Sequence, residues 1–291
     1  DKFGLILLDL DNMKLINDAQ GHSEGDDVIC HAADILKKFK KDYLRVYRYG
    51  GDEFIVMMNN INSPDTILNA GDLLLEVMNE EGIDFSGGIA LYPDDAENPD
   101  DLLKYADMAM YEAKRKGKND ICFFKSIMRE RFMEKIAIQT KLNDAIDHSL
   151  FQLYYQPQFD VATNKLRGFE ALLRWYDEEL GWINPEQFIP IAEETRLVIP
   201  LGDWILETAI KTLKSWQDKF KFDGIMSVNV SPIQLKKPTF IFDLVSYLKQ
   251  YEIPPASLEI EITEGIFIDN KNEVLGLLRQ IRDMGIGISL D

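Results

Sequence analysis

Strand-like and helical patterns alternate in the second half of this chain, and this alternation constrains the fold more than any other feature. Strands are expected at residues 152–159, 165–175, 224–230, 257–262 and 287–290. Helices are expected at residues 204–220, 240–250 and 272–284. Alternation after a first hairpin predicts parallel pairing, so this half of the chain resembles the first part of a (β/α) barrel.

The first half has a different order of elements. Strands are expected at residues 3–8, 43–48, 54–58, 83–91 and 121–124. Helices are expected at residues 23–39 and 66–78, and a third begins at Pro99 with Asn98 as its N-cap and stops at Gly117. The order β-α-β-β-α-β-α-β predicts an α/β (α+β) domain with a mainly antiparallel sheet.

A long helical pattern at residues 125–149 joins the two halves. We therefore expect a first domain at 1–125, a linker and leading helix at 126–149, and a second domain at 150–291. The first residue is Asp1 rather than Met, and Asp291 directly follows a strand pattern. We expect the chain to be a fragment cut inside both domains.

The charge balance limits the classes of ligand. Lys and Arg number 32 against 50 Asp and Glu, a net charge of -18, which argues against non-specific binding to nucleic acid duplexes. Small phosphorylated ligands remain compatible if divalent cations lie between carboxylate and phosphate. Cys30 and Cys122 suit a reducing compartment and are expected to be buried. No apolar run in these residues reaches the length of a membrane span, and no signal peptide is expected among them.

Two acidic strand ends form the first candidate site. Gly50-Gly51-Asp52-Glu53 is a hairpin turn with two acids, which alone is typical of a solvated turn. A core strand follows it, however, and Asp9 closes another apolar strand. Carboxylates from two strand ends make an oxygen-ligand site for Mg²⁺ or Mn²⁺, and the glycines allow a nucleotide to approach the backbone.

The turn resembles a known signature. Residues 48–54 (RYGGDEF) are similar to the signature of GGDEF domains, the diguanylate cyclases. Residues 13–26 and 111–119 resemble the nucleotide-binding and C-terminal motifs of that family. The resemblance implies a fold like the palm domain of nucleotidyl cyclases, and a homodimer in which two GTP-loaded copies meet face to face.

The resemblance also implies roles for single residues. Asp9 and Glu53 would hold the metals with help from the Leu10 carbonyl. Asp52 would be a metal ligand or help deprotonate the attacking 3′-hydroxyl. Asn17 and Asp26 would read the guanine edge.

Further residues would contact the rest of the nucleotide, namely Lys14, Gly50, Gly51, Lys114 and Lys118. Lys114 and Lys118 also complement the dipole of a helix C-terminus, and we expect both roles to apply. One departure from the family is clear. The product-inhibition motif Arg-x-x-Asp is replaced by 41–44 (KDYL), so the inhibitory site is expected to be lost.

The second candidate site lies in the expected barrel. Strand alternation puts Glu170 and Arg174 on one face, where a simple internal ion pair is the alternative interpretation. Asn229, Glu261 and Asp291, however, each lie at the C-terminal end of a later strand pattern. Four oxygen ligands at four successive strand ends would converge on the mouth of the barrel, and unpaired carboxylates placed together repel each other unless a cation joins them.

These residues resemble the EAL family of phosphodiesterases specific for cyclic di-GMP. The matching motifs are at 156–157 (QP), 170–174 (EALLR), 188–193 (FIPIAE), 229–231 (NVS) and 261–264 (EITE). The resemblance implies two-metal hydrolysis, with Mg²⁺ or Mn²⁺ held by Glu170, Asn229, Glu261 and Asp291. Arg174 would contact a phosphate, Gln156 would hold the nucleotide, and Glu264 would brace a loop carrying metal and dimer contacts.

The family continues beyond Asp291 with a second Asp, a Lys, a Glu and a Gln that catalysis needs. This sequence lacks them, so the fragment is expected to be inactive as a phosphodiesterase. The resulting hypothesis is a cytoplasmic protein of bacterial cyclic di-GMP signalling, with or without an upstream sensor or membrane anchor. We favour net hydrolysis of cyclic di-GMP to linear pGpG, with the first domain as a GTP-responsive regulator or a conditional cyclase. The alternative is a non-catalytic nucleotide receptor in the same pathway.

Overall fold

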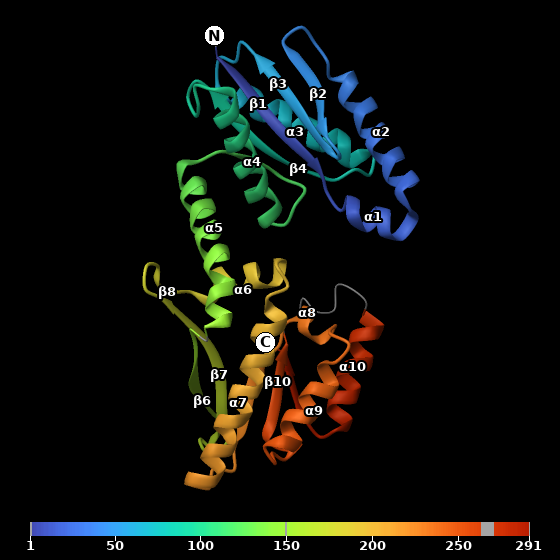
Figure 1. Ribbon diagram of the computed structural model, residues 1–291. Coiled ribbons are helices and arrows are strands. Elements are labelled where there is room, and N and C mark those ends of the chain that lie inside the picture. Colours follow the sequence, from blue (N-terminus) through green and yellow to red (C-terminus); the bar gives the residue numbers. More distant parts are fainter. Residues whose placement is uncertain (1, 149, 263–270, 291) are drawn as a thin grey trace. The chain divides into compact units, whose positions relative to one another are not determined.

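The computed structural model describes residues 2–148, 150–262 and 271–290. The chain divides into two compact units, residues 1–134 and 135–291, and the division falls inside helix α5 (Ser126–Asp147). The sequence placed the boundary at the beginning of this helix. The two units are described separately below (Figure 1).

The first unit is built on a five-stranded sheet. Its strands are β1 (Phe3–Leu10), β2 (Leu44–Gly50), β3 (Glu53–Asn59), β4 (Phe85–Tyr92) and β5 (Ile121–Phe123). Their order is β2-β3-β1-β4-β5, and every pair is antiparallel except β4 with β5. The mainly antiparallel sheet expected from the sequence is confirmed.

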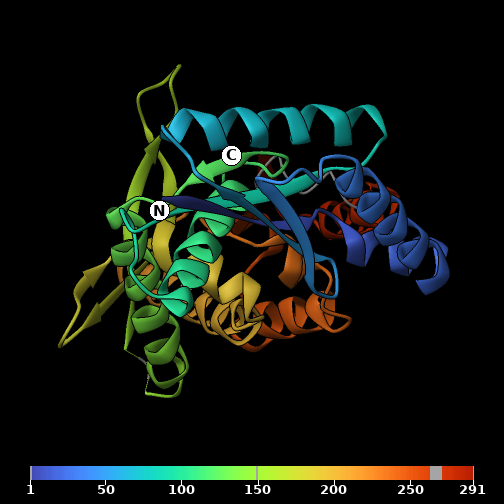
Figure 2. The same cartoon turned by 90° about the horizontal axis from the view of Figure 1, so that it is seen from above.

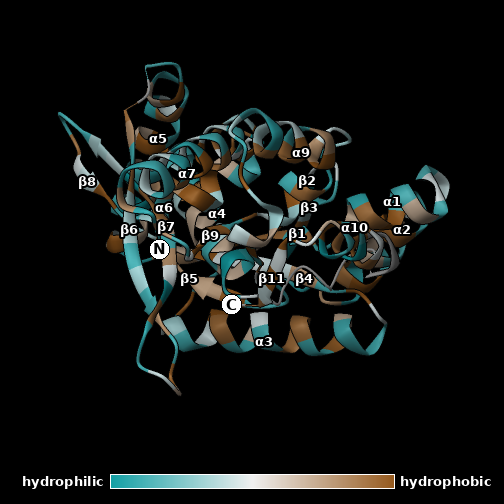
Figure 3. Cartoon of the chain, turned by 90° about the horizontal axis from the view of Figure 1, so that it is seen from below, coloured by the Kyte–Doolittle hydropathy of each residue, from teal (hydrophilic) through white to brown (hydrophobic). Residues whose placement is uncertain are grey.

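Helices cover both faces of this sheet, because β1 is apolar on both sides. The helices are α1 (Met13–Gln20), α2 (His22–Lys38), α3 (Pro64–Glu80) and α4 (Pro99–Arg115). Ile6 and Leu8 pack with α2 and α3, whereas Leu5 and Leu7 pack with α4. In Figure 2, α3 runs along the sheet, and Figure 3 shows hydrophobic and hydrophilic bands alternating along this helix. The sequence missed α1.

Helix α4 begins where its capping signal predicts. The side-chain oxygen of Asn98 accepts a hydrogen bond from the Asp101 backbone N–H at 2.8 Å, and Pro99 is the first helical residue. The helix lies very close to β4, because a Cβ atom on Gly88 would lie only 1.9 Å from the Ala106 carbonyl oxygen. This close packing brings the last turn of α4 near the end of β1.

The two cysteines differ in exposure. Cys122 is buried in β5 as expected, but Cys30 lies on the exposed side of α2. The expectation for Cys30 was wrong, because the buried face of α2 is formed by residues such as Ala32, Ile35 and Leu36.

The second unit has a six-stranded sheet with order β11-β10-β9-β7-β6, and β8 pairs with β7 off this path. The strands are β6 (Phe151–Phe159), β7 (Leu166–Asp177), β8 (Gly181–Ile183), β9 (Ile225–Asn229), β10 (Leu258–Ile262) and β11 (Gly287–Leu290). From β7 through β9 and β10 to β11 the pairing is parallel, whereas β6 and β8 are antiparallel to β7. The expected parallel pairing is confirmed.

One face of this sheet is covered by helices and forms the apolar core. The helices after α5 are α6 (Pro185–Glu194), α7 (Val198–Phe220), α8 (Pro232–Leu235), α9 (Phe240–Gln250) and α10 (Lys271–Asp283), with a 3-10 turn at η1 (Pro255–Ser257). Met226, Val228 and Ile260 point into this core. The sequence missed β8, α6 and α8. Within the described parts of the chain, no helix has the length and apolar character needed to cross a membrane.

Candidate functional site

The acidic residues of the first unit meet at the end of β1. Asp9 on β1 is directly opposite Glu53 on β3. The turn between β2 and β3 has Gly51 at φ 48°, a left-handed conformation that glycine adopts without strain. The Arg48 guanidinium donates two hydrogen bonds to the Gly51 carbonyl, at 3.0 and 2.7 Å. The turn is therefore held in place beside the two acids.

The electrostatics of this cluster favour a cation. Burial raises the pKa of Asp9, with Asp52 and Asp11 adding to the effect and Lys114 opposing it. Burial also raises the pKa of Glu53, and Asp9 adds to it. Lys114 Nζ lies 2.7 Å from Asp9 Oδ1 and supplies the nearest positive charge. A divalent cation would relieve the remaining repulsion.

Two further acids belong to this cluster but were not among the predicted site residues. Asp107 on α4 has a pKa raised by burial, and its charge raises that of Glu53. Asp11 is buried and accepts hydrogen bonds from Ser86 Oγ, at 3.0 and 2.9 Å, and from the Asn119 backbone N–H at 2.9 Å. Asp11 therefore ties the end of β1 to the loop after α4.

That loop carries Lys118, whose Nζ donates a hydrogen bond to Asn12 Oδ1 at 2.7 Å. Asn12 precedes α1, so Lys118 lies at the junction of β1 and α1. Lys114 and Lys118 thus both contact residues at or just after the end of β1. This placement is compatible with the phosphate contacts expected for them.

The expected guanine-reading residues lie on α1 and α2. A Cβ atom on Gly25 would lie 2.0 Å from Asn17 Oδ1, so Asn17 rests directly against the backbone of the residue that precedes Asp26. Asp26 is exposed, and so is Lys14 on α1. No hydrogen bond or ion pair joins Lys14 to the acids of β1 and β3 among the described residues. Asn17 therefore lies next to the backbone just before Asp26, whereas no such contact joins Lys14 to the acids of β1 and β3 in the described part of the chain.

The stretch that replaces the inhibitory motif is part of the core. Leu44 is buried among apolar side chains of the first unit. Its backbone forms a two-hydrogen-bond bridge with Lys41, at 3.0 and 3.1 Å. The side chain at position 44 therefore has a packing role.

In the second unit, the expected metal ligands lie on the sheet face opposite the apolar core. Glu261 is paired with Asn229 across β10 and β9, and Glu170 is paired with Ser227 across β7 and β9. Asn229 Nδ2 donates a hydrogen bond to Glu170 Oε1 at 2.7 Å. Asp291 and Glu264 lie outside the described residues. Three of the four expected ligands are therefore brought together.

One part of the sequence prediction was wrong. Asn229 ends β9, but Glu170 is not at a strand end, because β7 continues to Asp177. The pairing of β7 with β9 stops at Ala171, so the rest of β7 pairs only with β6 and β8. Glu170 still lies level with the ends of the parallel strands, because β7 is longer than they are.

A polar network that the sequence missed holds Glu261. Gln158 Nε2 donates to Glu261 Oε1 at 3.2 Å, while Gln158 Oε1 accepts from Arg167 at 3.1 Å and from Ser227 at 3.3 Å. Burial raises the pKa of Glu261, and the charge of Glu170 adds to this shift. The network fixes the orientation of the Gln158 amide, which in turn orients the carboxylate.

Arg167 also neutralises the other acid of β10. It pairs with Glu259 through its two terminal guanidinium nitrogens, with Nη1 at 3.0 Å from Oε1, and Ser227 Oγ donates to the same carboxylate at 3.0 Å. Glu259 is therefore satisfied by protein groups. Glu170 and Glu261 are the two acids of this face that lack a basic partner among the described residues.

The donor set suits a hard divalent cation. Glu170, Asn229 and Glu261 offer carboxylate and amide oxygens, the ligands that Mg²⁺ and Mn²⁺ prefer. Within residues 2–148, 150–262 and 271–290, no three His, Cys, Asp or Glu side chains gather closely enough to form a metal site by themselves. The described part of the second unit therefore supplies two carboxylates and one amide.

The expected nucleotide contacts flank these ligands. Gln156 on β6 is directly opposite Glu170. Arg174 lies four residues farther along β7 on the same face, with its guanidinium 5.7 Å from the centre of the Tyr154 ring. Both residues face the same side as the carboxylates.

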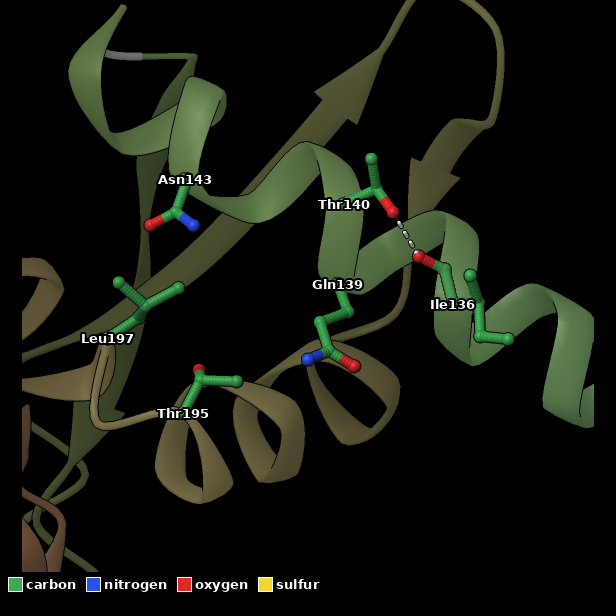
Figure 4. A pocket seen from close by; sticks show the side chains of 6 residues that line it. All are labelled: Ile136, Gln139, Thr140, Asn143, Thr195 and Leu197. Carbon is green, nitrogen blue, oxygen red and sulfur yellow. Dashed lines mark hydrogen bonds between the residues drawn. The ribbon is translucent and has the colours of Figure 1, made fainter.

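A separate hollow of about 620 Å³ lies between α5 and the segment from α6 to α7. Its lining side chains are labelled in Figure 4, where Thr140 Oγ1 donates to the Ile136 carbonyl at 2.8 Å. They are Ile136, Gln139, Thr140, Asn143, Thr195 and Leu197. None is charged, and α5 and α6 pack on the sheet face away from Glu170, so this hollow is not part of the acidic site.

Each of the two α/β domains thus carries acidic oxygen donors that form a candidate site for a divalent cation. A model of the EAL domain matches residues 139–291, and a model of the diguanylate cyclase, GGDEF domain matches residues 1–120. The chain belongs to the family of proteins in which a GGDEF domain is followed by an EAL domain.

Known proteins agree with this assignment. The bifunctional diguanylate cyclase/cyclic di-GMP phosphodiesterase MucR of Pseudomonas aeruginosa is 33% identical over 297 residues, which cover 100% of this chain and 43% of MucR. The solved structure of the PaMucR phosphodiesterase in complex with c-di-GMP is 32% identical with a TM-score of 0.51, covering 53% of this chain and 63% of that one.

The whole chain also has a counterpart in fold. The S helix-GGDEF-EAL structure of Vibrio cholerae LapD, bound to c-di-GMP, has a TM-score of 0.61 at 18% identity and covers 99% of this chain and 69% of that one. This chain spans less than half the length of the curated relatives that it matches.

Proposed function

We propose that the protein containing this chain turns over cyclic di-GMP, and that its EAL domain hydrolyses the messenger to linear pGpG. The convergence of Glu170, Asn229 and Glu261 on one sheet face carries this proposal. EAL-domain phosphodiesterases generally depend on divalent metals, and here Mg²⁺ or Mn²⁺ fits the oxygen donors. A relative binds c-di-GMP in its solved structure.

Each residue has a distinct task in this proposal. Glu170, Asn229 and Glu261 would hold the cations together with Asp291, which lies outside the described residues. When bound, the cations supply a water of lowered pKa and neutralise charge on the phosphate. Arg174 would bind a non-bridging phosphate oxygen through its fork of donors, and Gln156 would orient the nucleotide beside Glu170.

The GGDEF domain would bind GTP with Mg²⁺ through Asp9 and Glu53, and pair with a second copy. It would act as a GTP-responsive regulator or as a conditional cyclase. We place both domains in the cytoplasm, where the reducing conditions suit the free Cys30 and Cys122.

Incubation of the full-length protein with labelled cyclic di-GMP tests the proposal. Chromatography should show linear pGpG with Mg²⁺ or Mn²⁺, little with Ca²⁺, whose looser geometry holds the in-line arrangement poorly, and none with EDTA. Equal product with and without EDTA would contradict metal-dependent hydrolysis. Tight binding of cyclic di-GMP without any product would favour the receptor alternative.

A second prediction concerns the first domain. Cyclase output should escape feedback at the family's inhibitory site, because Leu44 is a core side chain without a hydrogen-bond acceptor and Lys41 lacks the planar fork of Arg. With the phosphodiesterase site disabled, the formation of cyclic di-GMP should stay linear until GTP runs down. Progress curves that flatten as product accumulates, and recover on dilution, would contradict this.

A further inference from the structure

A group of exposed aromatic side chains lies on and beside the part of β7 that extends beyond its pairing with β9. Tyr154 on β6, Tyr176 on β7 and Trp182 on β8 are 49%, 46% and 57% exposed. We name these three side chains the aromatic platform. The opposite face of the same strands is buried, since Leu173, Trp175 and Phe151 pack with α5, α6 and α7.

The three rings contact one another. The Tyr154 and Trp182 ring centres are 6.1 Å apart at 74°, and those of Tyr176 and Trp182 are 5.3 Å apart at 65°. Cross-strand aromatic pairs stabilise a hairpin without any ligand, and that structural role alone would explain the contacts between the rings. It does not explain why the rings are left half open to solvent on the face that carries the metal ligands.

The aromatic platform continues the face of Glu170. Strand alternation puts Glu170, Arg174 and Tyr176 on one side of β7. Tyr154 is opposite Leu172, which lies between Glu170 and Arg174 on that side, and Trp182 is opposite Tyr176. Tyr154 is only two residues from Gln156, the partner of Glu170, or about 7 Å along the strand. The distance is comparable with the reach from a phosphate to the base of one nucleotide.

A cation, Arg174, lies between Glu170 and Tyr176 along this face of β7. The Arg174 guanidinium is 5.7 Å from the centre of the Tyr154 ring and donates a hydrogen bond to the Leu173 carbonyl at 2.8 Å. It has no carboxylate partner in the part of the chain that the structure describes. Glu170, Arg174 and Tyr176 thus follow one another along one face of β7, with the Tyr154 ring beside Arg174 and Trp182 beside Tyr176. In a metal-bound nucleotide, the metal, the phosphate and the aromatic base follow one another in a matching order.

We propose that the aromatic platform binds one purine base of the cyclic dinucleotide, and that this base stacks mainly on the Trp182 ring. This inference rests on the proposed function, because it takes the bound dinucleotide as the occupant. A base stacked on Trp182 and flanked by Tyr154 would leave its phosphate beside Arg174. The platform would then contribute to affinity and leave the chemistry of hydrolysis unchanged.

Equilibrium binding of cyclic di-GMP to the full-length protein, with Ca²⁺ in place of Mg²⁺ to slow turnover, tests this. Trp182→Ala should raise Kd about tenfold, whereas Trp182→Phe, which keeps a ring, should stay within about threefold. Phe242→Ala removes another exposed aromatic, on α9, and should leave Kd within about twofold of the wild-type value. In turnover with Mg²⁺, Trp182→Ala should raise KM and keep kcat.

Fluorescence separates stacking from a purely structural role. Saturating cyclic di-GMP should quench the tryptophan emission of the wild type, and this quenching should be lost in Trp182→Phe although the variant still binds. An unchanged Kd in Trp182→Ala, or equal quenching in Trp182→Phe, would overturn the platform and leave the proposed function intact. If Trp182→Ala does not fold, the quenching result decides. A wild type that binds no cyclic di-GMP would overturn both.

Discussion

Replacing Glu170 by Ala in the full-length protein is expected to lower the rate of cyclic di-GMP hydrolysis by about a thousandfold or more. Glu170 supplies one of the two carboxylates that the described part of the site offers to a cation. Loss of a partner outside the first ligand shell already costs about 10- to 100-fold in metal affinity or activity, and loss of a ligand costs more. Formation of linear pGpG, followed by chromatography, measures the effect.

Two further variants make this result specific. Glu170→Gln keeps an acceptor for Asn229 Nδ2 and the volume of the side chain, but an amide oxygen is a weaker ligand than a carboxylate, so this variant should also be nearly inactive. Glu178→Ala removes an exposed acid after β7 and should be unaffected. Wild-type rates in both Glu170 variants would refute the assignment of this carboxylate as a ligand.

The sequence predicted the elements of the sheets well, because their apolar runs and turn signals are local. It missed elements whose stability depends on packing. Helix α1 has only eight residues, its N-cap Asn12 makes no side-chain capping bond, and Leu15 is left exposed. Helix α8 has four residues. Such short helices have marginal stability in isolation, and a periodic hydrophobic pattern does not predict them.

The candidate ligands were also readable, because acids and amides follow strand patterns. Their neighbours were not, because contacts across strands depend on register. A register shift after Gln158 places Arg167 in a bulge of β7, from where it reaches Glu259 and Gln158. The sequence gives no local sign of that bulge. The position of Glu170, level with the ends of the parallel strands, could not be predicted for the same reason, because it depends on how β7 pairs with β9.

The acidic cluster of the first domain also could not be predicted in full from the sequence. Asp107 lies on α4, almost a hundred residues from Asp9, and approaches Glu53 because Gly88 lets this helix pack tightly on β4. Asp9, Asp11, Asp52 and Glu53 lie at strand ends that the sequence shows, whereas Asp107 does not. The number of acids that a cation would have to neutralise could therefore be counted only in the folded structure.

This acidic cluster predicts that Asp9→Asn will weaken Mg²⁺-dependent binding of a non-hydrolysable GTP analogue by about 100-fold or more, because loss of a ligand costs more than the roughly 10- to 100-fold loss caused by removing a group outside the ligand shell. The substitution keeps the shape of the side chain and removes its charge. Calorimetry with and without Mg²⁺ measures the change. Asp72→Asn, an exposed position on α3, serves as the matched control and should bind as the wild type does.

The pH dependence of that binding gives a second readout. Burial raises the pKa of both Asp9 and Glu53, so protons compete with the cation above the usual carboxylate range. Affinity for Mg²⁺ and the analogue should therefore fall as the pH is lowered through these raised pKa values, and recover as it rises. In Asp9→Asn one titrating group is gone, and Glu53 loses the neighbouring charge that helps to raise its pKa. The residual binding should then depend less steeply on pH, with its midpoint at lower pH. An identical pH profile in the variant and the wild type would show that Asp9 does not share the cation with Glu53.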